Sequence, residues 1–238
     1  MNHVSMSIIV LMRDHRPPSS YSTLLHFCLH TYVTGIVTCG SSIQLRHVES
    51  KKYHLKSKPE AKFASGQQVV TLDVHSPDLW QVRNEHNKTC VVGEPIKCGS
   101  VIRLTHLKTR KNLHSNSDTQ RDVPAPLSRW NNEVNAFGKD GDGDSGDNFQ
   151  VECLHRRGEG KKGVWDTETR VQFRHNNSRY LLSSTTKAKY NQHNCPNCPI
   201  HGELEVSLTN KKGVEAISST VFQAAEDGVY LRSDGIIV

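Results

Sequence analysis

The chain is poor in three features that many functional classes need: aromatic residues, clustered positive charge and long hydrophobic runs. Aromatic residues make up 6% of its 238 residues, and its net charge of +6 comes from scattered Lys and Arg. A nucleic acid-binding surface usually combines a basic face with aromatic side chains that stack on bases, so no nucleic acid partner is expected. No segment has the ~18 apolar residues of a transmembrane helix, so no membrane span is expected.

The central part of the sequence also lacks a helical pattern and a recognisable catalytic set. Its apolar residues do not recur with the period of about 3.6 that a helix requires, and only the N-terminal stretch could be helical. No Ser/His/Asp combination or carboxylate pair stands out beyond chance, so nothing supports a nucleophile with a positioned base. The sequence therefore predicts a non-enzymatic all-β protein without a cofactor.

What the sequence does contain is one motif repeated three times. The motif runs from Cys39 to His47, recurs from Cys98 to His106, and recurs in weaker form from Thr169 to His175. The three histidines are 59 and then 69 residues apart. Repetition of a whole unit at such spacing indicates an architecture built from equivalent supersecondary units.

Each repeat continues with three further segments that resemble short strands. An apolar–polar step comes first, then a strand-like run, and each repeat closes with an aromatic residue, which is Trp80, Phe149 or Phe222. Four strands in each of three repeats give about twelve strands. We expect the three units to close on themselves in one pseudo-threefold body over residues 37–232, because closure leaves few free strand edges.

Several runs resemble MIR repeats, namely 37–41 (VTCGS), 95–99 (PIKCG), 103–106 (RLTH) and 112–115 (NLHS). The runs 133–138 (EVNAFG), 141–144 (GDGD) and 147–149 (DNF) resemble the second repeat of the stromal cell-derived factor 2 family. This resemblance implies a β-trefoil of three MIR repeats, at about 37–92, 93–160 and 161–232. Residues 1–36 would then be a signal or disordered segment, and 233–238 a tail.

The resemblance also implies a function. Stromal cell-derived factor 2 proteins are lumenal proteins of the endoplasmic reticulum that bind a lumenal J-domain co-chaperone. The expected role is to assist folding and quality control with that co-chaperone and a heat-shock chaperone, on unfolded or O-mannosylated clients. A glycan-binding or mannosyltransferase-associated module is the alternative, because MIR repeats also occur in protein O-mannosyltransferases. A trefoil lectin should carry an exposed aromatic residue and an Asp/Asn pair in every repeat, and the sequence does not show that set three times.

Four of the seven cysteines follow the repeat. If the first and last strands of a unit lie side by side, Cys39 pairs with Cys90 and Cys98 with Cys153. Four cysteines allow three connectivities, and reduced, buried thiols are the alternative in a cytosolic protein. We favour these two disulfides because the pairing obeys the pseudo-symmetry and because the resemblance implies an oxidising compartment.

The other three cysteines are Cys28 and the pair Cys195 and Cys198, which has His193 and His201 beside it. A redox site of the thioredoxin type would need a strand-to-helix context, which is absent. The four residues are of the types that bind zinc, but their spacing is crowded. A local disulfide or free loop thiols is the preferred interpretation, and the family resemblance assigns the pair no role.

An acidic run of Asp140, Asp142 and Asp144 resembles the start of a calcium-binding loop. The resemblance fails where Ser145 replaces the required Gly and Val151 replaces the final Glu. We therefore expect a solvated acidic hairpin loop with a possible role in partner contact.

The repeated His47, His106 and His175 invite a catalytic or metal-binding interpretation, which their symmetry disfavours. Residues at equivalent repeat positions usually serve equivalent packing or turn-capping roles, as we expect for these histidines and for the closing aromatic residues. Two N-glycosylation sequons, at Asn87 and Asn176, are placed by the strand pattern in loops.

The two ends of the chain bear on its location. Residues 22–37 are fairly apolar and follow Arg13 and Arg16, as in a signal peptide with a long basic start, although His26 and His30 interrupt the run. The last residues include no KDEL-like retention signal. We therefore expect the chain either to be retained in the endoplasmic reticulum lumen by a partner or to be secreted.

Overall fold

The computed structural model describes residues 35–63, 65–118, 123–154, 163–210 and 222–225. Residues Met1–Val33 and Thr34–Val238 are separate units, and all described residues belong to the second. The predicted tail, Cys28 and all but the last two residues of the predicted signal segment lie outside the described residues. Those two, Gly35 and Ile36, pair with the chain near Asp166 and Thr167, so the β structure begins before the predicted boundary at residue 37.

The described part is all-β, with one short 3-10 helix. Its elements are β1 (Ser42–His47), β2 (His54–Lys62), β3 (Gln68–Asp73), β4 (Trp80–Asn84), β5 (Val101–His106), β6 (Asn112–His114), β7 (Asn132–Glu133), β8 (Asn135–Phe137), η1 (Ser145–Asp147), β9 (Phe149–Leu154), β10 (Arg170–His175), β11 (Leu181–Lys189), β12 (Leu204–Thr209) and β13 (Phe222–Ala225). The thirteen strands correspond to the twelve expected, because β7 and β8 are one strand interrupted at Val134.

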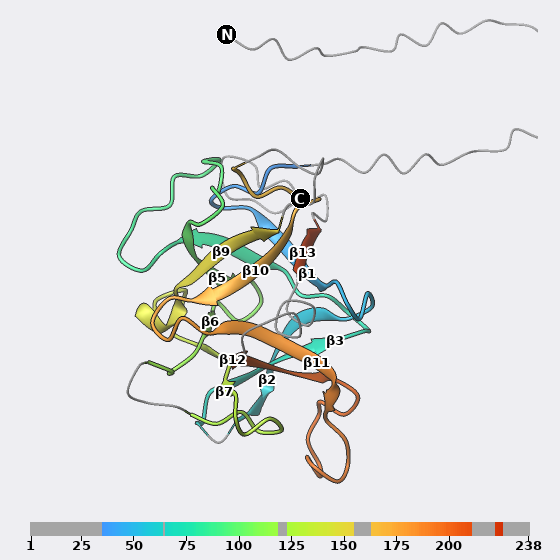
Figure 1. Cartoon of the computed structure of the whole chain (residues 1–238). Helices are drawn as coiled ribbons and strands as arrows, with labels where there is room; N and C mark the ends of the chain where they lie inside the picture. Colours follow the sequence, from blue (N-terminus) through green and yellow to red (C-terminus); the bar gives the residue numbers. More distant parts are fainter. Residues whose placement is uncertain (1–34, 64, 119–122, 155–162, 211–221, 226–238) are drawn as a thin grey trace, which may run out of the picture. The chain divides into compact units, whose positions relative to one another are not determined.

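Six of the strands form a closed barrel. The first and last strands of each repeat pair in the antiparallel order β1–β4–β5–β9–β10–β13, and β13 returns to β1. Figure 1 shows these strands grouped in the upper half of the body. A closed barrel has no free edge strand, so none of these strands offers an unpaired backbone edge to another chain.

The remaining strands form three hairpins that cover one end of the barrel. These hairpins are β2–β3, β6 with β7 and β8, and β11–β12, one from each repeat. They also pair with one another, through β3–β8, β12–β7 and β3–β12. A six-stranded barrel capped by three hairpins in threefold arrangement is a β-trefoil, as the sequence predicts.

The pseudo-threefold symmetry is visible at the level of single hydrogen bonds. The residue ten positions before each repeated histidine is Val37, Ile96 or Trp165. The amide of Val37 donates to the carbonyl of Trp165 at 2.9 Å, that of Ile96 to Val37 at 2.9 Å, and that of Trp165 to Ile96 at 2.8 Å. The three repeats therefore meet in a closed ring of backbone hydrogen bonds.

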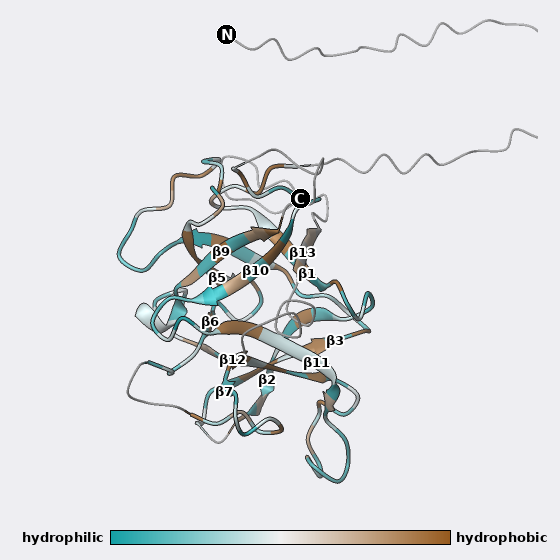
Figure 2. Cartoon of the chain, viewed as in Figure 1, coloured by the Kyte–Doolittle hydropathy of each residue, from teal (hydrophilic) through white to brown (hydrophobic). Residues whose placement is uncertain are grey.

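One hydrophobic core fills the trefoil and follows the same symmetry. Equivalent buried sets are Ile43, Ile102 and Val171; Leu45, Leu104 and Phe173; Leu55, Leu113 and Leu182; and Trp80, Phe149 and Phe222. Figure 2 shows hydrophobic residues concentrated on the strands and hydrophilic residues in most of the loops. Burial of this large apolar surface is the main force that holds the repeats together. Within the described residues, no helix has the length and apolarity needed to cross a membrane.

Candidate functional site

The three repeated histidines occupy identical positions at the ends of β1, β5 and β10. All three are completely buried. Their Nδ1 atoms lie 2.8–2.9 Å from the hydroxyl of the residue three positions later, in the pairs His47–Ser50, His106–Thr109 and His175–Ser178. The residue after each hydroxyl has a left-handed backbone with φ of 57–62°. Each histidine therefore fixes a tight turn between two strands.

Each histidine ring also packs on the closing aromatic residue of the preceding repeat. The ring centroids are 5.0 Å apart for Trp80 and His106, 5.2 Å for Phe149 and His175, and 5.7 Å for Phe222 and His47. The members of each pair lie opposite each other in neighbouring strands. These six residues join one repeat to the next, and their burial leaves them no access to a substrate.

Three disulfides are present in the structure. Cys39 is joined to Cys90 and Cys98 to Cys153, which are the pairs that the repeat symmetry favours. Each links the start of a repeat to the chain just beyond or within its last strand, and each spans more than 50 residues. The third joins Cys195 to Cys198 in the loop after β11.

The most developed polar site lies around η1, in the second repeat. Asp147 is completely buried and accepts hydrogen bonds from Asn112 Nδ2 at 2.8 Å and from the Asp144 amide at 3.1 Å. Its other oxygen lies 3.0 Å from Nδ1 of His114. Asp144 in turn accepts from the amide of Gly146 at 2.7 Å, which completes a reciprocal cap on the 3-10 helix.

The pKa values of the two histidines beside η1, His114 and His175, shift in opposite directions. Burial lowers the pKa of His175 to about 4, and its ring Nε2 lies 3.1 Å from the Gly146 carbonyl. Burial also acts to lower the pKa of His114, but its hydrogen bonds with Asp147 and Asn116 outweigh that effect and raise it. Both partners of His114 accept hydrogen bonds, at 3.0 and 2.8 Å, as an imidazolium requires.

This network forms the floor of a pocket of about 540 Å³, which we call the η1 pocket. Its lining residues are His114, Ser115, Asn116, Asp118, Val123, Asp144, Ser145, Gly146 and Asn177. Two aspartates and two asparagines are among these residues, and their side-chain oxygens can accept hydrogen bonds from a ligand. Atoms of His114, Asp144 and Asp147 that could bind a metal lie within 4.8 Å of one another. However, both ring nitrogens of His114 already have partners. We therefore interpret the three residues as a structural cluster in which His114 pairs with the two carboxylates.

The acidic run is solvated, as the sequence predicts, because Asp140, Asp142 and Asp144 are all exposed. Asp147, which follows the run, is buried instead. Its partners are Asn112 and His114, which lie 35 and 33 residues earlier in the chain, so the acidic run itself gives no sign of its burial.

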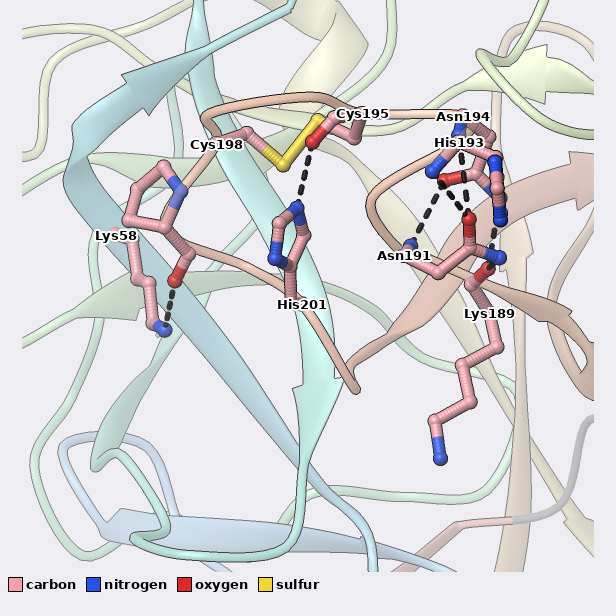
Figure 3. The surroundings of a disulfide bond; sticks show 9 residues. Lys58, Lys189, Asn191, His193, Asn194, Cys195, Cys198 and His201 are labelled. Carbon is pink, nitrogen blue, oxygen red and sulfur yellow. Dashed lines mark hydrogen bonds between the residues drawn. A yellow bond between two sulfur atoms is a disulfide. The ribbon is translucent and has the colours of Figure 1, made fainter.

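The four residues considered as weak zinc candidates lie together in the loop after β11 (Figure 3). Because the sulfurs of Cys195 and Cys198 are bonded to each other, they are not the thiolates that a zinc site needs. His201 Nε2 lies 2.6 Å from the carbonyl of Cys195 and donates to it. His193 is exposed, and its backbone amide donates to Asn191.

The two sequons lie in turns between strands, but they differ in exposure. Asn87 is exposed, in a left-handed backbone conformation between β4 and β5. Asn176 is half-buried, and the hydroxyl of its sequon partner Ser178 faces His175. Asn87 is the better placed acceptor in the folded protein.

Sequence reasoning missed a group of buried carboxylates among the capping hairpins. Glu133, Glu203 and Glu205 are all buried and face the side chain of Tyr190. Glu205 accepts hydrogen bonds from the Leu127 and Ser128 amides, yet burial raises its pKa. Glu133 and Glu205 lie at equivalent repeat positions. This recurrence was the one signal in the sequence that could have identified them.

Comparison with known proteins gives the family. A family model of the MIR domain matches residues 35–197. Human stromal cell-derived factor 2 is 33% identical over 207 residues, which cover 85% of this chain and 86% of that protein. The crystal structure of the SDF2-like protein from Arabidopsis thaliana is 31% identical, with a TM-score of 0.66, over 81% of this chain and 96% of that one.

A larger protein contains a similar module. The structure of the Saccharomyces cerevisiae protein O-mannosyltransferase Pmt1-Pmt2 complex, bound to the sugar donor, has a chain that is 25% identical with a TM-score of 0.69. The match covers 91% of this chain but 29% of that one. The triple repeat, the trefoil and these likenesses agree, and the chain belongs to the stromal cell-derived factor 2 family of MIR-domain proteins.

Proposed function

We propose that the chain is a non-enzymatic binding protein of the endoplasmic reticulum lumen that assists protein folding and quality control. It acts with a lumenal J-domain co-chaperone and a heat-shock chaperone, on unfolded or O-mannosylated clients. The observation that carries this proposal is membership of the stromal cell-derived factor 2 family over most of the chain. The resemblance described above implies this partnership for the family.

Two features of the structure support a lumenal location. The Cys39–Cys90 and Cys98–Cys153 disulfides tie together the ends of the first two repeats. Such bonds persist in oxidising compartments and are rare in the cytosol. The exposed Asn87 would be accessible to the lumenal glycosylation machinery.

A binding role also agrees with how the polar residues are used. The three repeat histidines are committed to turns, and His114 is held by Asp147 and Asn116. The described residues of the η1 pocket include no cysteine and two serines: Ser115 donates to the Glu133 carbonyl, and Ser145 accepts from the side-chain amide of Asn177. A positioned nucleophile and base are what covalent catalysis would need.

Affinity purification tests the proposal. The tagged chain is expressed in cells under reducing-agent stress, and the proteins bound to it are identified by mass spectrometry. We expect a lumenal J-domain co-chaperone and a heat-shock chaperone, and we expect neither with a version that lacks residues 1–36 and stays in the cytosol. Recovery of no lumenal chaperone with the full chain would refute the partnership.

A glycan-binding role is the second candidate, favoured by the η1 pocket. The aspartates and asparagines that line this pocket can hydrogen-bond to hydroxyl groups, and a similar module belongs to the mannosyltransferase structure. Among the described residues, no Phe, Tyr or Trp lines the pocket, although sugar-binding sites usually include one to stack on the sugar ring. Selective binding of mannosides on a glycan array, lost in an Asp144→Asn variant, would place this role first.

A further inference from the structure

The third disulfide lies in a loop that differs from the rest of the trefoil. The segment from Tyr190 to Glu203 joins β11 to β12, and Figure 1 shows the chain after β11 extending away from the strands. The Cys195–Cys198 disulfide joins residues only three positions apart, whereas the other two span 51 and 55 residues. Because it closes a short ring within one loop, this bond does not hold any pair of strands together.

The loop has other restraints that keep its shape. At its base, the Tyr190 amide donates to the Glu203 carbonyl and the Gly202 amide donates back to Tyr190, both at 2.9 Å. The Cys195 amide donates to the Asn191 carbonyl at 2.9 Å, and Lys58 Nζ donates to the Pro199 carbonyl at 2.9 Å (Figure 3). The loop can therefore stay in place when the disulfide opens, which keeps the two sulfurs close enough to re-form it.

The disulfide is accessible from solvent and has an imidazole neighbour. Cys195 and Cys198 are half-buried, and the two residues between them, Pro196 and Asn197, are exposed. Figure 3 shows the imidazole of His201 beside the disulfide, where it donates to the Cys195 carbonyl. The thiolate is the reactive form of cysteine in exchange reactions, and a histidine ring beside a cysteine can help to generate it.

A small buried apolar cluster lies beside this loop. Cys195 and Cys198 pack against a small cluster of Ala61, Val69, Tyr190 and Ile200, which is separate from the main core. Leu127 packs on the same cluster, and three residues further on the side chain of Trp130 is 83% exposed. The exposed side chain of Trp130 is available for contact with the apolar side chains of an unfolded polypeptide.

We propose that Cys195 and Cys198 form a thiol–disulfide exchange site that acts on the cysteines of unfolded client polypeptides. A client thiolate attacks one sulfur of the loop disulfide, a client–loop disulfide forms, and the other loop cysteine leaves as a thiolate that takes up a proton. A second client thiolate then attacks the mixed disulfide. The client gains a disulfide and gives two electrons to the loop, which is left as two thiols.

The reverse sequence, started by the reduced loop, opens a client disulfide and restores the Cys195–Cys198 bond. The two directions together rearrange client disulfides without any external oxidant. This activity lies outside the chaperone partnership. Its use in cells requires the proposed lumenal location, but the chemistry itself can be tested on the purified protein.

The first experiment measures how easily each disulfide opens. The purified full chain carries Cys28→Ser, so that only the six cysteines of the three disulfides remain. It is equilibrated in glutathione buffers of increasing reducing strength, alkylated and mapped by mass spectrometry. The reducing strength of each buffer is the squared concentration of reduced glutathione divided by the concentration of oxidised glutathione. We expect the Cys195–Cys198 bond to be half-reduced at a value at least tenfold lower than the values that open the other two bonds. If all three disulfides open together, or the loop opens last, the proposal fails.

The second experiment measures exchange itself. Scrambled ribonuclease is the client, and its recovered activity reports disulfide rearrangement in a fixed glutathione buffer. We expect the chain to raise the recovery rate several-fold over glutathione alone, and we expect a Cys195→Ser/Cys198→Ser variant to remove that gain. Equal rates for the two proteins would overturn the proposal even if the loop disulfide opens easily.

The role of His201 has its own readout. The reduced loop of a His201→Gln variant should react several-fold more slowly with iodoacetamide at pH 7, and a matched His193→Asn variant should react at the original rate. A failed exchange assay would leave the chaperone partnership intact, because that is tested by co-purification in cells.

Discussion

Removing the Cys98–Cys153 disulfide is expected to lower the free energy of unfolding by about 4 kcal/mol. The bond closes a loop with a sequence separation of 55 residues, and the entropy that such a closure removes from the unfolded chain corresponds to about 4 kcal/mol at 25 °C. The same relation gives about 2 kcal/mol for the Cys195–Cys198 bond, because its residues are three positions apart. The two disulfides should therefore differ by about a factor of two.

The size of this effect makes it easy to measure. Domains are usually stable by about 5–15 kcal/mol, so a loss of about 4 kcal/mol removes a large share of the total. A Cys98→Ala/Cys153→Ala variant and its matched control, Cys195→Ala/Cys198→Ala, would be unfolded with guanidinium chloride. Fluorescence is a suitable signal because Trp80 and Trp165 are fully buried.

The comparison can refute the reasoning in two ways. A loss below about 1 kcal/mol in the first variant would show that the unfolded chain is not restricted as the loop-length relation requires. An equal or larger loss in the Cys195→Ala/Cys198→Ala control would show that the loop disulfide is structural. That second result would also weaken the proposed exchange role.

Three further predictions concern single residues. The pKa of His175 is about 4 in the folded state and 6.5 in an unstructured chain, so the unfolded protein binds the proton first as pH falls. About 3 kcal/mol of stability should therefore be lost between about pH 6.5 and pH 4. Denaturation at several pH values should show a flatter stability profile for a His175→Gln variant, and an identical slope would contradict this. Gly146→Ala should cost about 1–3 kcal/mol, because a Cβ would lie 2.5 Å from the His114 ring and 2.7 Å from the Ser115 carbonyl, and an unchanged melting temperature would rule out this packing. The buried Tyr190 hydroxyl has no hydrogen bond with the described residues, so Tyr190→Phe should raise the free energy of unfolding by up to about 1 kcal/mol, whereas a loss of that size would reveal a partner.

The features that could be predicted from the sequence are those that recur between repeats. Equivalent residues such as His47, His106 and His175 meet the same physical requirement in every repeat, so a recurring residue indicates a recurring contact. The strand count and the closed pseudo-threefold body follow from this repetition, and the β-trefoil is what the resemblance to MIR repeats implies.

The features that sequence reasoning missed depend on contacts between residues far apart in the chain. The network of Asn112, His114 and Asp147 exists only in the second repeat, and Asp147 resembles its exposed acidic neighbours until the fold buries it. Glu205 was similarly missed, because the amides that satisfy it come from Leu127 and Ser128, 77–78 residues earlier in the chain. A buried charge cannot be identified until its distant partners are known.

Reconstitution with a purified lumenal J-domain co-chaperone tests the central claim most directly. Sedimentation velocity of the full chain mixed with the co-chaperone should show a complex that is absent from either protein alone. The complex should also suppress aggregation of a reduced, unfolded client more strongly than the co-chaperone does by itself. If the chain sediments alone at every concentration tested and leaves client aggregation unchanged, the proposed chaperone function is wrong.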